Sequence, residues 1–224
     1  MSQLNKQDIQ RELAMRELAR RNLWYYLQYV FPWFQNIAYQ WDEDNLIHDQ
    51  IIEALMASWN GEAKRLMINC PPRLGKSMIA SQYFPSRWLG KDPTLNFIQA
   101  AYGAELSNSF GRKTNQITME QSYKNVFPDF ELSQEKREWG NRETKQRWGY
   151  YSVGVGGALT GKGWDYLIID DPVKDRMEAD SPTIQQRNID WYDSVASTRL
   201  QTQDSRIICI MTRWSVDDLG GYIL

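Results

Sequence analysis

The stretch RLMINCPPRLGKS, residues 65–77, decides how the rest of the chain is interpreted. Its apolar run Leu66–Ile68 predicts a buried strand, and Gly75–Ser77 predicts the start of a helix after a tight turn. The spacing of Cys70–Ser77 matches the phosphate-binding pattern G-x-x-x-x-G-K-[ST], with a cysteine where the first glycine usually stands. The strand, turn and helix that this pattern requires are all predicted around it.

A loop of this kind binds phosphates because backbone N–H groups and a helix N-terminus form a concave, positive site. Lys76 would place its charge at the β- and γ-phosphates, and Ser77 would offer its hydroxyl to Mg²⁺. Arg73 either reaches the γ-phosphate or pairs with a nearby carboxylate and holds the loop in shape. The alternative is that the stretch is only a turn that joins a strand to a helix.

The one histidine, His48, lies shortly before this loop, on a helix that is predicted over Leu46–Trp59. A lone histidine on a helix is most often structural, although this position makes a contact with an adenine edge feasible. The predicted nucleotide-binding residues are Cys70, Pro71, Pro72, Arg73, Leu74, Gly75, Lys76, Ser77 and His48.

The composition limits the class of protein. A chain of 224 residues is long enough for one sizeable core, and 42% apolar and 24% charged residues are ordinary for a globular protein. No apolar run approaches the ~20 residues that a membrane span needs, and the charged N-terminus is not a signal peptide. Cys70 and Cys209 are expected to be buried thiols in a reducing compartment. The net charge of −2 implies that any nucleic-acid contact is local, or is supplied by a ring of subunits or another domain.

Periodicity and turn signals divide the chain into alternating helices and strands. Helices are predicted over Asn5–Val30, Leu46–Trp59, Ser77–Trp88 (closed by Gly90), Ala104–Met119 and Pro182–Ser197. Strands are predicted over Leu66–Ile68, Leu95–Ala101, Trp148–Val153, Asp165–Asp170 and Arg206–Met211. Such alternation indicates a mostly parallel sheet with helices on both faces, whose ligands bind at the carboxyl ends of the strands.

Two other segments leave alternatives open, and a third has the composition of a loop. The first predicted helix either packs its apolar stripe on the domain or docks a neighbouring subunit. A charged stretch over residues 131–147 forms either a solvated face or a DNA-facing patch. Its basic residues are Lys136, Arg137, Arg142, Lys145 and Arg147. The glycine-rich segment Gly154–Gly163 is typical of a mobile loop.

The second half of the predicted site follows the later strands. Asp170 closes an apolar run and would hold Mg²⁺, as a Walker B aspartate does. Asp171 would polarise the attacking water, or else it only shapes the turn before Pro172. Thr212 and Arg213 follow the last strand and would sense the γ-phosphate, although hydroxyl-bearing residues are also common at strand ends without that role. Lys162 and Arg112 are candidates for a charge that is presented to the nucleotide of a neighbouring subunit, and a solvated lysine is the alternative for Lys162.

With these residues assembled, the sequence resembles the ATPase domain of the large terminase subunit, the DNA-packaging motor of tailed bacteriophages. The resemblance covers nearly the whole chain. It rests on CPPRLGKS (70–77), AYGAEL (101–106), GGALTGKGWDYLIIDDPVKD (156–175), WYDS (191–194) and TRWSVDDLGG (212–221).

The resemblance implies an α/β fold of the RecA-like, additional-strand class of P-loop NTPase, and the strand Leu95–Ala101 between the two Walker strands fits that class. It implies that Lys76 and Asp171 act in catalysis, that Ser77 and Asp170 hold Mg²⁺, and that Thr212 stands in a coupling motif. Arg73 is added to the catalytic candidates from its place in the loop. His48 falls where relatives often carry the adenine-reading glutamine. Lys162 falls where relatives often carry arginine, near a trans-acting finger, and lysine lacks the fork of donors that arginine has.

The resemblance also implies partners and a division of the chain. ATP would be the substrate, and double-stranded DNA, the portal protein, the small terminase subunit and a homo-oligomeric ring on the portal would be the partners, in the host cell cytoplasm. Residues 1–60 would form a helical, adenine-side segment and residues 61–224 the ATPase core, with a nuclease domain absent after the last residue. The isolated domain can be monomeric. The rival functions are another P-loop DNA motor such as a helicase, and a nucleotide switch without hydrolysis.

Overall fold

The computed structural model describes residues 5–31, 46–133, 142–145, 149–158, 163–199 and 202–224. The strands are β1 (Arg65–Asn69), β2 (Phe97–Ala101), β3 (Arg142–Glu143), β4 (Gly149–Gly154), β5 (Tyr166–Asp170) and β6 (Arg206–Met211). The longer helices are α1 (Lys6–Arg21), α2 (Leu23–Val30), α4 (Leu46–Asn60), α6 (Phe84–Lys91), α7 (Ala104–Met119) and α10 (Pro182–Trp191). The shorter ones are α5 (Lys76–Met78), α8 (Gln121–Val126), α9 (Arg176–Ala179) and α11 (Leu219–Ile223), with π turns η2 (Ile79–Tyr83) and η3 (Tyr192–Ala196) and the 3₁₀ turn η4 (Ser197–Arg199).

The sheet has the strand order β1-β6-β5-β2-β4-β3, in which every pair is parallel except β3 with β4. The α/β fold of the additional-strand class is therefore confirmed. The strand that lies between the two Walker strands, β1 and β5, is β6. The predicted strand at Leu95–Ala101 separates them only in sequence, because β2 pairs with the other side of β5.

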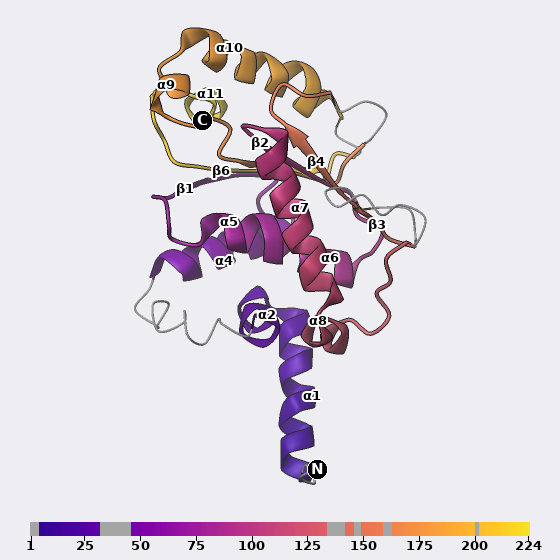
Figure 1. The fold of residues 1–224 in the computed structure, drawn as a ribbon. Coiled ribbons are helices and arrows are strands. Elements are labelled where there is room, and N and C mark those ends of the chain that lie inside the picture. Colours follow the sequence, from indigo (N-terminus) through magenta and orange to yellow (C-terminus); the bar gives the residue numbers. More distant parts are fainter. Residues whose placement is uncertain (1–4, 32–45, 134–141, 146–148, 159–162, 200–201) are drawn as a thin grey trace.

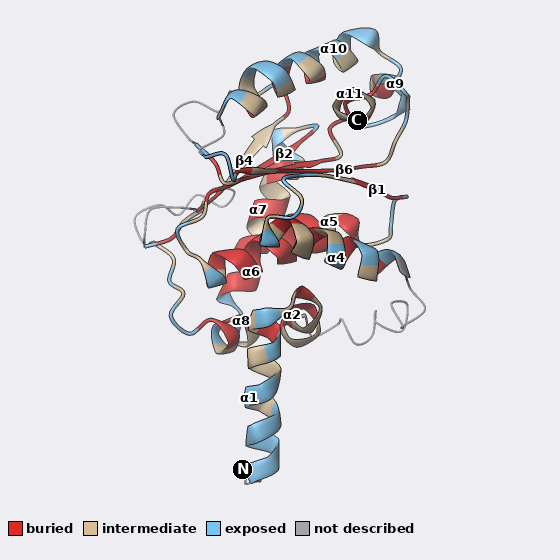
Figure 2. Ribbon diagram, turned by 180° about the vertical axis from the view of Figure 1, so that it is seen from behind, coloured by how far each residue is buried: buried red, intermediate tan, exposed pale blue. Residues whose placement is uncertain are grey.

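Helices cover both faces of the sheet (Figure 1). Successive residues of a strand point to opposite faces, so Ile168 joins a core with α2, α4 and α6, whereas Leu167 and Ile169 join a second core with α10 and α11. Both cores are continuous across neighbouring strands. The turn η2 and the helix α6 are almost wholly buried, as the red ribbon in Figure 2 shows, so the helical run that follows the candidate phosphate-binding loop lies at the centre of the larger core.

The predicted helix over Asn5–Val30 is wrong in one respect, because it is two helices. Asn22 adopts an extended backbone (φ −136°, ψ 137°), and its side chain accepts a hydrogen bond from the Trp24 N–H, capping α2. The apolar stripe is buried only from Ala19 onward, while Ile9 and Leu13 remain 48% and 57% exposed. The N-terminal part of α1 extends away from the rest of the molecule (Figures 1 and 2).

Gly90 does not end its helix, because α6 continues to Lys91. A β-carbon at Gly90 would lie 2.4 Å from Cδ2 of Phe127 and 2.6 Å from the Tyr123 hydroxyl. Glycine is therefore required by the close approach of α8 and the loop after it. Of the predicted basic patch, Lys145 forms an ion pair with Glu131, and Lys136, Arg137 and Arg147 lie outside the described residues.

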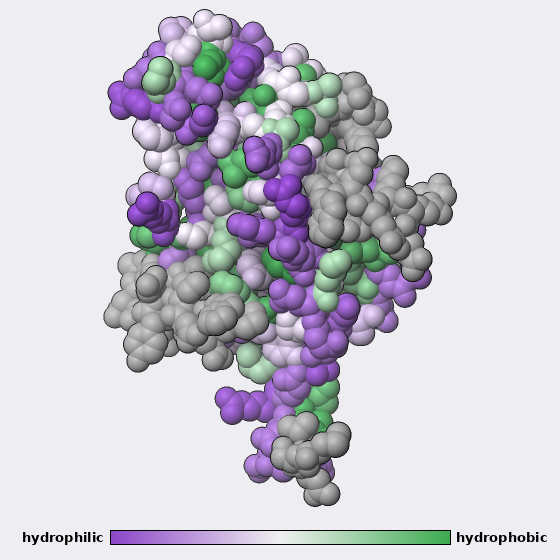
Figure 3. Space-filling view, in the orientation of Figure 1, coloured by the Kyte–Doolittle hydropathy of each residue, from purple (hydrophilic) through white to green (hydrophobic). Residues whose placement is uncertain are grey.

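Hydrophilic side chains dominate α10 and most of α1 on the face that Figure 3 shows. Within the described ranges, no helix combines the length and the hydropathy that crossing a membrane would require.

Candidate active site

The candidate phosphate-binding loop, residues 70–77, joins the end of β1 to the start of α5. Gly75 stands at the N-cap with φ +74°, a left-handed conformation that disfavours other residues, and Lys76 begins the helix. Arg73 has φ +67°, and its side chain is exposed. No residue in the described part of the chain forms an ion pair with Arg73, so its guanidinium is available at the rim of the loop.

Lys76 is buried, and its ammonium group connects three strand ends. It donates to the Cys70 carbonyl (3.1 Å), to the Thr212 hydroxyl (2.8 Å) and to Oδ1 of Asp171 (3.3 Å). These residues follow β1, β6 and β5, which are neighbours in the sheet. The structure therefore brings Lys76, the candidate phosphate-binding lysine, together with the candidate catalytic carboxylate and the candidate sensor hydroxyl.

Asp170 is fully buried and accepts two hydrogen bonds from the helix that follows the loop. Ser77 donates to its Oδ1 (3.0 Å), and Ser81, in η2, donates to its Oδ2 (2.6 Å). Burial raises the pKa of Asp170 to about 7, and the charge of Asp171 adds to this effect. A carboxylate held this way is poorly compensated without a cation.

The residues present fit Mg²⁺. The Ser77 hydroxyl and an Asp170 oxygen lie within hydrogen-bond distance of each other, and both are the hard oxygen ligands that Mg²⁺ prefers. Among the described residues there is no cluster of three or more His, Cys, Asp or Glu side chains able to hold a metal. Mg²⁺ itself is usually held by one or two protein ligands together with waters and substrate phosphates.

Asp171 has φ +46°, which is unusual for a residue with a β-carbon. Its backbone is held on both sides, because its N–H donates to the Ile210 carbonyl (2.8 Å) and its carbonyl accepts from the Tyr102 N–H (3.1 Å). Its Oδ1 lies 3.3 Å from the Thr212 N–H as well as from Lys76. The turn therefore aims the carboxylate at the loop lysine while leaving it 38% exposed.

The side chains of Thr212 and Arg213, the predicted coupling pair, have different surroundings. Thr212 belongs to the site, because its hydroxyl also donates to the Cys70 carbonyl (3.2 Å). Arg213 faces away, toward Asp218 (Nε–Oδ2 3.0 Å), whose Oδ1 accepts from the Gly221 N–H at the start of α11. Arg213 therefore links the end of β6 to α11.

His48 supports the loop from the side of α4. It is buried, and its Nε2 lies 2.7 Å from the Leu74 carbonyl, so that this nitrogen carries the proton and donates. Burial lowers the pKa of His48, which favours the neutral ring. Its predicted contact with adenine stays a prediction.

The candidates for a trans-acting charge stay predictions. Lys162 lies outside the described residues, and Arg112 is half-buried on α7. The described beginning of the glycine-rich segment is anchored, because Trp191 of α10 donates its indole N–H to the Gly157 carbonyl (3.0 Å). The sequence analysis included Trp191 in the WYDS segment but did not predict this anchor, and it missed Ser81, which belongs to no local motif.

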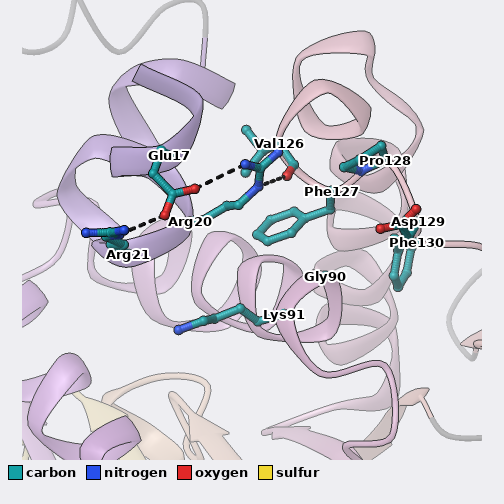
Figure 4. Close-up of a pocket in the computed structure, with 10 residues that line it drawn as sticks. All are labelled: Glu17, Arg20, Arg21, Gly90, Lys91, Val126, Phe127, Pro128, Asp129 and Phe130. Atoms are coloured by element: carbon teal, nitrogen blue, oxygen red, sulfur yellow. Dashed lines mark hydrogen bonds and ion pairs between the residues drawn. The ribbon is translucent and has the colours of Figure 1, made fainter. Parts of the chain in front are cut away.

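A separate hollow of about 460 Å³ lies between α1, the end of α6 and the loop after α8 (Figure 4). Glu17 pairs with Arg20 and Arg21, and Arg20 also donates to the Val126 carbonyl (2.6 Å). The charges around this hollow are thus largely matched within it. It shares no residue with the phosphate-binding loop.

The model of the family described as "Terminase large subunit, T4likevirus-type, N-terminal" matches residues 67–219. The chain belongs to this family. No curated protein matches it. Among solved structures, the chain is similar to a mutant of the large terminase ATPase domain of Thermus phage P74-26, with 17% identity, a TM-score of 0.48, and 70% of this chain and 63% of that chain covered. It is also similar to the Phi-28 DNA packaging motor, with 11% identity and a TM-score of 0.43. That match covers 67% of this chain and 47% of the motor chain. The chain thus spans less than two thirds of either solved chain.

Proposed function

We propose that this terminase-family chain is an ATP-hydrolysing motor domain that drives double-stranded DNA into a viral procapsid. The observation that carries the proposal is the convergence of Lys76, Asp170 and Asp171 at neighbouring strand ends. Phosphoryl transfer needs a cationic phosphate site, a metal-holding carboxylate and a group that orients water, and these residues supply each of them. Membership of the terminase family supports the packaging role.

Each residue of the site would have its own role in ATP hydrolysis. Lys76 would exchange Asp171 and Thr212 for phosphate oxygens when nucleotide binds, and Arg73 would approach the γ-phosphate from the rim. Ser77 and Asp170 would hold Mg²⁺, which neutralises charge on the phosphates. Released from Lys76, Asp171 would orient the attacking water. Thr212 directly follows β6, the strand between β1 and β5, and would report the state of the nucleotide to α11 through Arg213.

Assembly belongs to the same proposal. The motor would act as a ring of subunits on the portal protein, with the small terminase subunit, in the host cell cytoplasm. Lys162 or Arg112 would then serve the nucleotide of a neighbour. Because such a finger contributes about 10³-fold or more to the rate, the chain on its own would turn over ATP slowly.

The test compares Asp171→Asn and Lys76→Ala with Asp217→Asn, a control at an exposed carboxylate. We expect Asp171→Asn to bind ATP like the wild type and to lose about 10²–10⁴-fold in turnover, because positioned acid–base groups contribute that much. Lys76→Ala should bind weakly, and Asp217→Asn should match the wild type. Full turnover by Asp171→Asn would refute the assignment of this residue.

The rival functions give different results. A helicase would separate the strands of a forked DNA duplex in the presence of ATP, whereas a packaging motor would not. A nucleotide switch would bind ATP without turnover at any protein concentration.

A further inference from the structure

Ser81 contacts the candidate metal-holding carboxylate but belongs to no recognised motif. Its side chain is fully buried, and its hydroxyl donates to Oδ2 of Asp170 at 2.6 Å, a shorter contact than the 3.0 Å bond from Ser77 to Oδ1. Ser77 and Ser81 are four residues apart, so their side chains lie on the same side of the helix. Each of the two carboxylate oxygens therefore has its own hydroxyl donor.

The backbone carbonyl of Ser81 accepts hydrogen bonds from two neighbouring elements. Ser81 lies within the π turn η2, where the Phe84 N–H reaches back five residues to the Ile79 carbonyl. The Ser81 carbonyl instead lies 3.1 Å from the Tyr150 hydroxyl of β4, and the Thr114 hydroxyl of α7 approaches it at 3.5 Å. Two neighbouring elements thus fix the position from which the Ser81 hydroxyl contacts Asp170.

A metal ion places different demands on the two serines. Ser77 has to present a hydroxyl lone pair to Mg²⁺ while it contacts Asp170, so its orientation depends on the ion. Ser81 has no such second task, because its hydroxyl is enclosed and directed only at Oδ2. Ser81 is thus the donor whose contact with the carboxylate does not depend on the ion.

We propose that Ser81 is a positioning residue for the metal site: its hydroxyl holds Oδ2 of Asp170 so that Oδ1 faces Ser77 and the ion. The inference rests on the proposed function in taking Ser77 and Asp170 as the residues that hold Mg²⁺. Groups that orient metal ligands typically contribute 10–100-fold to metal affinity. We expect an effect of that size here.

The experiment measures Mn²⁺ binding by electron paramagnetic resonance, using protein loaded with a non-hydrolysable ATP analogue. Ser81→Ala should bind the analogue like the wild type in the presence of EDTA, and should bind Mn²⁺ 10–100-fold more weakly. Ser81→Thr, which keeps the hydroxyl, should restore most of the affinity.

Ser86→Ala is the matched control. Ser86 is also a fully buried serine of the same helical run, but its hydroxyl contacts the Tyr83 carbonyl (2.8 Å) and the Tyr26 hydroxyl (2.7 Å) instead of a carboxylate. Its removal should leave the Mn²⁺ affinity unchanged. Should Ser81→Ala fail to fold by circular dichroism, Ser81→Cys keeps the volume with a weaker donor and should lower the affinity in the same direction.

Unchanged Mn²⁺ affinity in folded Ser81→Ala or Ser81→Cys would overturn the inference, and so would an equal loss in Ser86→Ala. Turnover by the wild type is measured separately. A wild type that binds Mn²⁺ with the analogue but never hydrolyses ATP contradicts the proposed function and leaves the role of Ser81 standing. Hydrolysis by the wild type, with no change of Mn²⁺ affinity in Ser81→Ala, contradicts the role of Ser81 alone.

Discussion

Replacing Gly90 by alanine places two energetic effects in direct opposition. Gly90 lies inside α6, where alanine gains about 0.8–1.0 kcal/mol of helix propensity over glycine. The added methyl group, however, would lie 2.4 Å from the ring of Phe127, far inside van der Waals contact. Phe127 and Tyr123 are both buried, so neither ring can turn toward solvent. Overpacking of this kind costs about 1–3 kcal/mol, and an approach of 2.4 Å to a buried ring places the cost in the upper part of that range, so the clash should outweigh the gain by about 1–2 kcal/mol.

We therefore expect Gly90→Ala to lower the free energy of unfolding by about 1–2 kcal/mol and Tm by about 2–8 °C for a chain of this size. The assay is urea denaturation of wild type and variant, followed by tryptophan fluorescence and circular dichroism. Coincident transitions would justify two-state treatment. A variant that is as stable as the wild type, or more so, would refute the reasoning.

A double-mutant cycle identifies the clash itself. In a Phe127→Leu background the smaller side chain leaves room for the methyl group, so the loss caused by Gly90→Ala should shrink. A coupling energy of about 0.5–3 kcal/mol is expected for residues in contact. If the two changes are additive, the loss arises from some other cause.

Two further predictions concern Asn22, where the chain passes from α1 to α2, and the buried carboxylate of Asp170. Asn22→Ala removes the cap of α2 and should lower the free energy of unfolding by about 1 kcal/mol, whereas Asn22→Ser should retain most of it in the same urea assay. Burial raises the pKa of Asp170 to about 7, so the folded, metal-free protein binds a proton more tightly than the unfolded chain does. Its stability should therefore fall as the pH rises from about 4 to 7, and this contribution should vanish in Asp170→Asn. Identical pH profiles of the two proteins between pH 5 and 7 would contradict the assignment.

The sequence predicted those parts of the candidate site whose geometry is set by residues close together in the chain. The phosphate-binding loop and the aspartates after β5 each combine a short motif with an apolar run, so their positions followed from spacing alone. The parallel sheet followed from the alternation of elements. The alternation of elements did not predict that β6 lies between β1 and β5, because the order of strands along the chain does not determine their order in a sheet.

The features that the sequence analysis did not predict share one physical cause, which is contact between segments that are distant in the chain. The helical period continues through Asn22, but burial of α2 against the core and the side-chain cap interrupt the helix there. Gly90 resembles a helix end in sequence, and only the ring of Phe127 gives it a different role. Ser81 is one serine among many until the fold places it against Asp170.

The projecting α1 would enlarge small movements of the helices that hold it. Its 16 residues correspond to about 24 Å of helix, and Arg87 of α6 holds the end nearest the core through the carbonyls of Ala19 and Arg20. Tyr29 of α2 contacts Glu12 and Arg16 of α1, so α1 and α2 would have to move together. Since α6 continues the run that begins at the loop before Lys76, a tilt of this helix pair by about 10° would move the far tip of α1 by about 4 Å.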